Sequence, residues 1–388
     1  MTDAISVAVM ISTFNRAAFL RDCIDSVLAQ SLAAAQIIVV DDGSDDGTEA
    51  LCREYEDQIV YIGQENSGKS VALNRGMEAV TSSHICFFDD DDYMLPDALS
   101  AHQKTLRGAP KDAYSYSPHL VFADDGAHWI GDQRHWQPVR TPQHAEPGEM
   151  LVKTLEWGRY FLTYLQGMLI PVSLVHSLGG FDPDLLRGQD YDMMLRLAAS
   201  AQAHDTQVAS FVMRSHTGPR GPASDRHSSA QRFAVWHKYD RKIVLRYRGA
   251  LSLFDYLSTP DVDQSLTAQE RCRALIQKFD IMLSHSLYRE ACEDLDLLFG
   301  DGSSGPRTGE LYEHISSAVT AAANFSYEFQ SSQASTFAKQ ITKLSKHHRI
   351  PGLRLATARG MSWSAYRSLK ESQWKMLSQV ILAARHLL

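Results

Sequence analysis

Residues 5–48, ISVAVMISTFNRAAFLRDCIDSVLAQSLAAAQIIVVDDGSDDGT, decide the fold. Two short apolar runs, Val7–Ile11 and Ile37–Val40, flank the segment Ala18–Leu28, whose apolar residues recur at helical spacing. The alternation continues along the chain, with further apolar runs at Ile59–Ile62 and Ile85–Phe88. Uniformly apolar strands that alternate with helices predict an α/β fold, in which a mostly parallel sheet has helices on both faces.

Polar and acidic residues follow these strands at the point where each strand ends. Parallel strands joined by right-handed crossovers put their carboxyl ends at one edge, where the ligands of such sheets bind. We therefore expect four segments to meet at one rim: Ser12-Thr13-Phe14-Asn15, Asp41-Asp42-Gly43-Ser44, Gly63–Ser70 and Asp89-Asp90-Asp91-Asp92. Turn formation would explain any one of the first three. Four consecutive carboxylates, however, repel one another unless a cation binds between them.

The acidic run predicts a site for Mn²⁺ or Mg²⁺. Carboxylate oxygens are the hard ligands that these ions prefer, and the phosphates of a bound nucleotide would supply further ligands. Asp89 and Asp91 lie two apart, so a regular strand would turn both to the same side as metal ligands. Asp90 would face the other way, toward a ribose or sugar hydroxyl, and Asp92 would only cap the segment that follows.

A competing interpretation comes from Gly63–Ser70, which matches the phosphate-loop pattern GxxxxGK[ST]. It would make the protein a P-loop NTPase or kinase, with the acidic run assisting Mg²⁺. Two features disfavour it. Only about 20 residues separate Lys69 from the acidic run, and the charge of Glu65 would repel a phosphate. Lys69 remains a candidate contact to a diphosphate in either interpretation.

The length of 388 residues suits two domains. Strand patterns fade near residue 228, and helical patterns follow at 230–256, 267–287, 289–299, 310–330 and 362–387. We therefore expect an α/β domain over residues 1–230 and an all-helical domain over residues 231–388. The net charge of −8 gives no sign of nucleic-acid binding. Between residues 338 and 388, however, ten basic residues stand against one acidic residue.

Eight motifs occur in order along the chain: VMISTFNR, SVLAQS, IIVVDDGSDDGT, ENSGKSVALNRGMEAV, FFDDDDYMLPDAL, LGGFDPDL, GQDYDMMLRLA and MRSHTG. Together they resemble glycosyltransferase family 2 over roughly residues 5–230. The resemblance implies the GT-A fold and the transfer of a sugar, with inversion, from a nucleotide-sugar to an acceptor hydroxyl. It also makes UDP the expected nucleotide, with dTDP and GDP as alternatives. The helical remainder is not covered by the resemblance.

The resemblance assigns roles to individual residues. It implies that Asp89, Asp90 and Asp91 form the DXD element that holds the metal and the donor diphosphate. His216 matches a position that adds a metal or diphosphate contact. Together with the rim residues above, the candidate nucleotide and donor contacts are Ser12, Thr13, Asn15, Asp41, Asp42, Asn66, Lys69, Asn74, Arg75 and Asp90.

Asp190 matches the catalytic base of the family. An inverting transfer needs one base to take the proton of the acceptor hydroxyl. Asp190 opens a predicted helix, whose N-terminus stabilises a carboxylate, whereas Asp192 would point elsewhere. The family usually has Glu before the base, and Gln189 in its place leaves the acceptor type open. Trp157, in an aromatic stripe of the kind that is usually core, is a candidate to stack on an acceptor sugar. Gln189 is a second candidate for an acceptor contact.

The sequence thus predicts a metal-dependent transferase that acts on a nucleotide-sugar and a glycan or lipid-linked acceptor, in polysaccharide or glycoconjugate synthesis. An inactive sugar-nucleotide-binding protein is the non-enzymatic alternative. Five cysteines without a CxxC pair, no visible signal sequence and no apolar stretch of roughly 20 residues favour a cytoplasmic protein. The basic, aromatic-rich segment 362–387 would contact the inner face of a membrane or join two copies as a homodimer.

Overall fold

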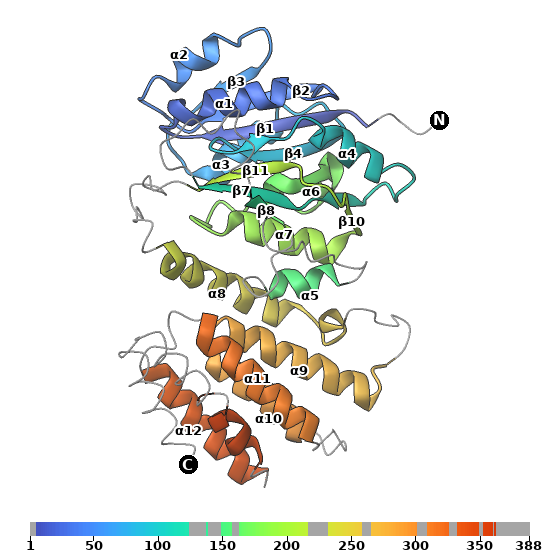
Figure 1. Ribbon diagram of the computed structural model, residues 1–388, viewed down its shortest axis with the longest axis vertical. Helices are drawn as coiled ribbons and strands as arrows, with labels where there is room; N and C mark the ends of the chain where they lie inside the picture. The colour runs from blue at the N-terminus through green and yellow to red at the C-terminus, as the bar shows by residue number, and fades with distance from the viewer. Residues whose placement is uncertain are drawn as a thin grey trace. The chain divides into compact units, whose positions relative to one another are not determined.

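The computed structural model of the chain describes residues 5–123, 137–138, 149–156, 163–215, 232–257, 265–300, 309–325, 332–348, 352–359 and 361. Contacts divide the chain into two compact units, one of Met1–Thr154 with Phe161–Ala230 and one of Leu155–Tyr160 with Gln231–Leu388. In the described residues the first unit is an α/β structure and the second is helical (Figure 1).

A seven-stranded sheet in the order β10-β6-β9-β4-β1-β2-β3 forms the centre of the first unit. Neighbouring strands β4, β1, β2 and β3 are parallel, whereas β9 runs antiparallel to both β4 and β6. The expected mostly parallel α/β sheet is therefore confirmed. Its strands are β1 (Val7–Thr13), β2 (Gln36–Asp41), β3 (Val60–Gly63), β4 (His84–Asp89), β6 (Tyr114–Tyr116), β9 (Met168–Pro171) and β10 (Ala203–Asp205).

Helices cover both faces of the parallel strands. Val9 and Ile11 of β1 lie in one apolar cluster with Leu20 and Ile24 of α1 (Ala17–Leu28). On the opposite face, α3 (Lys69–Met77) packs on β1 and β2, with its glycine at position 76 close to the Met10 side chain. Because both faces are buried, successive residues of these strands are apolar instead of alternating with polar ones.

A second sheet in the order β5-β11-β7-β8 lies in the same stretch of the chain. Its strands are β5 (Tyr93–Met94), β7 (His119–Ala123), β8 (Gln137–Pro138) and β11 (Phe211–Ser215). Since β5 directly follows the acidic run, its pairing with β11 anchors the end of that run. The other helices before residue 230 are α2 (Thr48–Arg53), α4 (Ala98–Thr105), α5 (Met150–Leu155), the 3-10 helix η2 (Leu165–Gly167), α6 (Val172–Ser177) and α7 (Gln189–Ser200).

The second unit confirms the expected helical character of the C-terminal region. In its described part α10 packs against α9 and α12, and α11 packs against α9. The helix α12 was not among the predicted helices, and the predicted helix 362–387 lies outside the described residues. The elements are α8 (Arg232–Ala250), η5 (Phe254–Tyr256), α9 (Ala268–Ser284), α10 (Tyr288–Gly300), α11 (Gly309–Phe325) and α12 (Ser332–His347).

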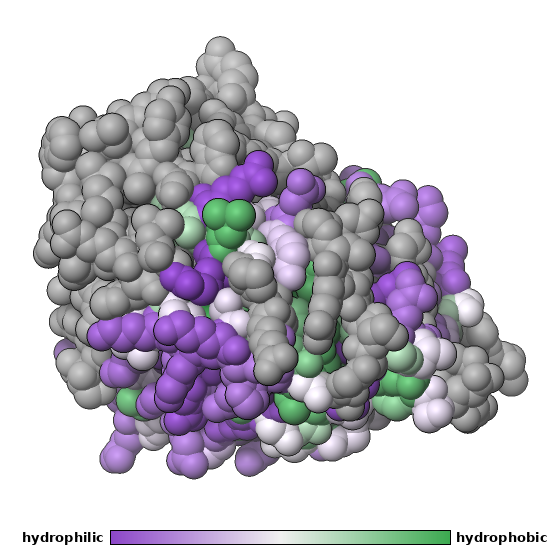
Figure 2. Space-filling model, turned by 90° about the horizontal axis from the view of Figure 1, so that it is seen from below, coloured by the Kyte–Doolittle hydropathy of each residue, from purple (hydrophilic) through white to green (hydrophobic). Residues whose placement is uncertain are grey.

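No helix in the described part of the chain has the length and apolar character needed to cross a bilayer. Figure 2 shows one face of the molecule, on which hydrophilic and hydrophobic residues are interspersed with residues drawn in grey. The large hydrophobic side chains that are exposed come from separate elements and loops: Val60, Leu186, Val208, Leu245, Leu297 and Leu355. Single exposed apolar side chains are normal on protein surfaces, so they do not mark an interface by themselves.

Candidate active site

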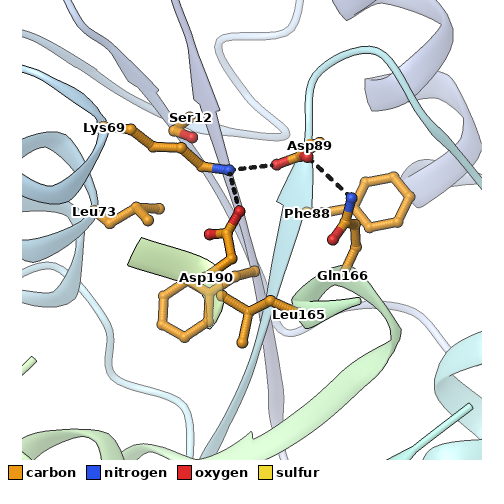
Figure 3. Close-up of a pocket in the computed structure, with 9 residues that line it drawn as sticks. Ser12, Lys69, Leu73, Phe88, Asp89, Leu165, Gln166 and Asp190 are labelled. Carbon is orange, nitrogen blue, oxygen red and sulfur yellow. Dashed lines mark hydrogen bonds and ion pairs between the residues drawn. The ribbon is translucent and has the colours of Figure 1, made fainter. Parts of the chain in front are cut away.

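The carboxyl ends of β1, β2 and β4 meet at one edge of the seven-stranded sheet. The register pairs Ser12 of β1 with Asp89 of β4, and Thr13 of β1 with Asp41 of β2. Helices α3 and α7 begin at the same edge, so the segments expected at one rim do lie together. A pocket opens there (Figure 3), lined by Ser12, Lys69, Leu73, Phe87, Phe88, Asp89, Leu165, Gln166 and Asp190.

The acidic run forms a tight turn after β4, and this acidic turn comprises Asp89, Asp90, Asp91 and Asp92. The Asp92 N–H donates to the Asp89 carbonyl at 3.3 Å. Carboxylate oxygens of Asp89, Asp91 and Asp92 lie within 4.8 Å of one another. The expectation that Asp92 only caps the next segment was therefore wrong. Because β4 ends at Asp89, the two-residue alternation of a strand does not extend through the turn.

Arg16, in the loop between β1 and α1, balances part of the acidic charge. Its Nη1 lies 3.0 Å from Asp90 Oδ1 and 2.6 Å from Asp91 Oδ2. Burial raises the pKa of Asp90 to about 6, although Arg16 opposes the rise. Burial also raises the pKa of Asp92, and the charges of Asp91 and Asp89 add to the effect. The turn thus directs Asp90 into an ion pair with Arg16, and its contact with a ribose or sugar hydroxyl stays a prediction.

Lys69 connects the acidic turn with Asp190. Its Nζ donates to Asp89 Oδ1 at 2.8 Å and to Asp190 Oδ2 at 3.2 Å (Figure 3). Burial lowers the pKa of Lys69, but Asp190 and Asp89 outweigh burial and raise it above its ordinary value, so the ammonium stays charged. The three side chains are 30%, 31% and 35% exposed for Lys69, Asp89 and Asp190, which leaves them within reach of a ligand.

Asp190 is the second residue of α7. The preceding Gly188 has φ +76°, a left-handed conformation that glycine adopts without strain, and it sets the entry into the helix. Burial raises the pKa of Asp190, and Lys69 opposes the rise. Asp190 Oδ1 is buried and has no hydrogen-bond partner among the described residues. Asp192 points elsewhere, as expected, because it pairs with Arg196 at 2.8 Å.

The acidic pair after β2, Asp41 and Asp42, is bound by neutral donors of the chain itself. Asp41 accepts hydrogen bonds from the Ser44 N–H and the Tyr61 hydroxyl, each at 2.9 Å. Asp42 accepts three, from the Gln64 side chain at 2.7 Å and from the N–H groups of Ser67 and Gly68 at 2.8 Å. A carboxylate has about four acceptor positions, so a contact of either residue with a nucleotide base stays a prediction.

The loop Gly63–Ser70 does not offer an open phosphate cradle. A phosphate loop uses its backbone N–H groups to bind phosphates, but here the N–H groups of Ser67 and Gly68 bind Asp42. Lys69 is turned toward Asp89 and Asp190. This arrangement argues against the NTPase or kinase interpretation.

The remaining candidates lie around the edge in different ways. Asn15 ties the loop after β1 to the loop after β2, because its N–H donates to Ser44 and its side chain accepts from Asp45. Asn74 exchanges two hydrogen bonds of 2.8 Å with the backbone of Phe181, which holds its amide in a structural contact. The other four do not line the pocket of Figure 3: Asn66 and Arg75 are exposed, and Thr13 and Gln189 are buried.

Two of the side chains that bind the acidic turn, Arg16 and Gln166, were not predicted from the sequence. Arg16 ends the motif VMISTFNR, which could have pointed to it. Gln166 lies in the apolar stretch FLTYLQGMLIPVSLV, where nothing marks it as functional. Two predicted residues, Trp157 and His216, lie outside the described residues.

The seven-stranded sheet with helices is of the GT-A type, and the acidic turn lies at its carboxyl edge. Residues 8–161 match the family described as Glycosyl transferase family 2. The resemblance to this family is thereby confirmed over residues 8–161.

Curated relatives carry the same designation. The chain is 30% identical over 215 residues to the uncharacterized glycosyltransferase RT0329 of Rickettsia typhi, covering 54% of this chain and 65% of that protein. It is 32% identical over 125 residues to the putative teichuronic acid biosynthesis glycosyltransferase TuaG of Bacillus subtilis, covering 31% of this chain and 49% of that protein. The chain spans between 34% and 65% of the length of four relatives from Rickettsia species.

A solved structure shares the fold along most of the chain. The crystal structure of S. aureus TarS 1-349 in complex with UDP-GlcNAc has a TM-score of 0.51 at 13% sequence identity, covering 94% of this chain and 92% of that chain. At this identity the likeness concerns the fold.

Proposed function

We propose that the protein is a metal-dependent, inverting glycosyltransferase. It transfers a sugar from a nucleotide-sugar, with UDP as the nucleotide, to a hydroxyl of a glycan or lipid-linked acceptor in polysaccharide or glycoconjugate synthesis. Residues 1–230 form the catalytic domain, and residues 231–388 form a helical domain. The UDP-GlcNAc bound by TarS supports a UDP-linked donor, and the assigned role of TuaG supports a polysaccharide product.

The observation that carries the proposal is the position of Lys69. Its ammonium lies between Asp89 of the acidic turn and Asp190 at the start of α7, at 2.8 and 3.2 Å. A transferase needs a positive site for the leaving diphosphate beside a base for the acceptor hydroxyl. In the pocket of Figure 3, Lys69 is the positive group and Asp190 is the candidate base, and the two side chains contact each other directly.

The acidic turn fits a divalent cation. Three carboxylates with oxygens within 4.8 Å of one another supply the hard oxygen ligands that Mn²⁺ and Mg²⁺ prefer. Asp89, Asp91 and Asp92 would hold the ion. When bound, it would supply Lewis acidity that neutralises charge on the departing diphosphate.

Lys69 and Asp190 have different roles in the proposed reaction. Lys69 faces the diphosphate as a second positive charge. The carboxylate of Asp190 takes the proton of the acceptor hydroxyl as its oxygen forms the new bond to the anomeric carbon. The bond from that carbon to the diphosphate oxygen breaks on the opposite side, so UDP leaves and the configuration inverts. Its raised pKa makes Asp190 a stronger base than an exposed aspartate.

Calorimetry and product release test the function together. We expect UDP to bind in the presence of Mn²⁺ and to lose most of its affinity in EDTA, and we expect UDP release from at least one UDP-sugar in a panel that includes UDP-GlcNAc. Mn²⁺-dependent UDP binding without any turnover would favour the inactive binding protein. Binding of ATP in place of UDP would favour the phosphate-loop enzyme.

The basic segment 362–387 is proposed as a peripheral membrane contact or a homodimer contact, and it lies outside the described residues. Its aromatic residues with Lys and Arg are typical of helices that lie in a membrane interface. Flotation with anionic liposomes compares the full chain with a version that ends near residue 360. If both remain unbound at low salt, the membrane contact is wrong, and the oligomeric state of the two versions then tests the dimer.

A further inference from the structure

The side chain of Gln166 joins two carboxylates of the acidic turn. Its Nε2 donates to Asp89 Oδ2 at 2.9 Å and to Asp92 Oδ2 at 3.1 Å. A primary amide carries two N–H donors on one nitrogen, which is what a bridge between two acceptors requires. Gln166 is 7% exposed and lines the pocket beside Asp89 (Figure 3).

The backbone around Gln166 is fixed on both sides. The Cys86 thiol donates to the Gln166 carbonyl at 3.4 Å. The next residue, Gly167, bonds through its carbonyl to the Ser117 N–H at 2.9 Å. A Cβ at Gly167 would overlap Thr163 Oγ1, so only glycine allows this close approach. The backbone at Gln166 is therefore held in place by contacts that do not involve the acidic turn, and it fixes the point from which the side-chain amide reaches the turn.

Gln166 differs in charge from the other side chains that hold the turn. Arg16 pairs with Asp90 and Asp91, and Lys69 pairs with Asp89, so both cancel negative charge that would attract a metal. The amide of Gln166 orients two carboxylates and leaves their charge intact. Removing a side chain that orients the ligands from outside the ligand shell usually lowers the affinity for the metal by about 10–100-fold.

We infer that Gln166 is a positioning residue for the metal of the transfer reaction. It holds Asp89 and Asp92 in the orientation in which they bind the ion, and this role rests on the proposed function. Gln166 need not touch the ion or the substrate. Removing its N–H donors while keeping its volume should therefore weaken binding of Mn²⁺ and leave the fold intact.

The test is calorimetric titration of the full chain with Mn²⁺ at a saturating concentration of UDP. Gln166→Met keeps the length of the side chain and removes both donors, and we expect it to raise the Kd for Mn²⁺ by about 10–100-fold. Gln103→Met is the matched control. Gln103 donates to the Ile5 carbonyl at 3.1 Å, away from the acidic turn, so this variant should bind Mn²⁺ as the wild type does.

A second variant separates positioning from packing. Gln166→Glu keeps the shape but places a further carboxylate against Asp89 and Asp92, so like charges repel when no cation is present. We expect a lower Tm in EDTA than for the wild type and a larger rise in Tm on adding Mn²⁺. Gln103→Glu serves as the control and should show the wild-type rise.

The outcomes separate the two levels of the proposal. If the wild type binds UDP only with Mn²⁺, but Gln166→Met has a Kd for Mn²⁺ within twofold of the wild type, Gln166 has no positioning role and the proposed function stands. If the wild type itself shows no Mn²⁺-dependent UDP binding, the proposed function fails and the role of Gln166 fails with it.

Discussion

Two acidic segments lie at the same edge of the sheet, and they are held in different ways. Asp41 and Asp42, after β2, accept hydrogen bonds from neutral hydroxyl, amide and backbone donors. The acidic turn after β4 is held by the charged side chains of Arg16 and Lys69 in addition to neutral donors, which are the Gln166 amide and the Arg214 N–H. Three of its carboxylates have oxygens within 4.8 Å of one another.

The two segments differ in the charge of their partners. The donors that bind Asp41 and Asp42 are neutral, whereas Arg16 and Lys69 bring positive charge to the acidic turn. The crowded carboxylates of Asp89, Asp91 and Asp92 lie beside the partly exposed ammonium of Lys69 and keep a net negative charge. A metal ion would compensate this charge, and a bound diphosphate would change the contacts of the ammonium. We therefore expect the acidic pair after β2 to shape the loops of the edge and the acidic turn after β4 to provide its chemistry.

The largest effect is expected at Asp190, the carboxylate across the pocket from the acidic turn. Asp190→Asn should reduce transfer by about 10²–10⁴-fold, because the base is lost, while Mn²⁺-dependent binding of UDP persists. Burial raises the pKa of Asp190 above its ordinary value of 3.8, so wild-type transfer should fall as the pH drops through this raised pKa and the base becomes protonated. Initial rates of UDP release against pH measure both effects. Transfer by Asp190→Asn within tenfold of the wild type would show that another group is the base.

The next effect compares the two acidic segments directly. Asp89→Asn should raise the Kd for Mn²⁺ by at least the 10–100-fold that is typical of changes outside the ligand shell, and UDP binding should lose its dependence on the metal. Asp41→Asn is the matched variant in the other segment. It should keep the metal dependence of UDP binding, whatever its effect on UDP affinity. Calorimetric titration of UDP into each variant, with Mn²⁺ and with EDTA, measures this metal dependence. If both variants keep it or both lose it, the two acidic segments do not differ in metal binding.

The sequence predicted the sheet and the segments that meet at its carboxyl edge, but it did not predict the side-chain contacts at that edge. The apolar runs at Val7–Ile11 and Ile37–Val40 predicted buried parallel strands because burial on both faces leaves a local pattern. The expectation for Asp92 was wrong because its carboxylate binds Gln166 and the Arg214 N–H, which are far away in the chain. The role of Gln166 could not be predicted, since its partners Asp89 and Asp92 are more than 70 residues away in the chain.

A smaller effect is expected at Lys69, which reaches from α3 to the acidic turn. Lys69→Met should weaken UDP binding in Mn²⁺ by about tenfold, the equivalent of one charge-assisted contact of roughly 1.5 kcal/mol, and it should not abolish binding. Asp89 and Asp190 would then lack their shared cation. Titration of UDP into the variant measures the change. A complete loss of nucleotide binding would instead fit the essential lysine of a phosphate loop.

The smallest functional effect is expected at Asp42, and it should appear in stability. Asp42→Asn replaces one acceptor oxygen with an amino group, although Gln64, Ser67 and Gly68 all donate to this side chain. At least one of these partly exposed donors then loses its acceptor, which costs about 0.5–1.5 kcal/mol. Urea unfolding in EDTA should show that loss, while the rise in Tm produced by Mn²⁺ should equal that of the wild type, because the acidic turn is untouched. Asp89→Asn should show the reverse: the rise with Mn²⁺ should nearly vanish, and replacing one of the crowded carboxylates should relieve part of the repulsion in EDTA. If Asp42→Asn instead loses the Mn²⁺ response and keeps its stability, the acidic pair after β2 belongs to the chemistry of the edge as much as the acidic turn does.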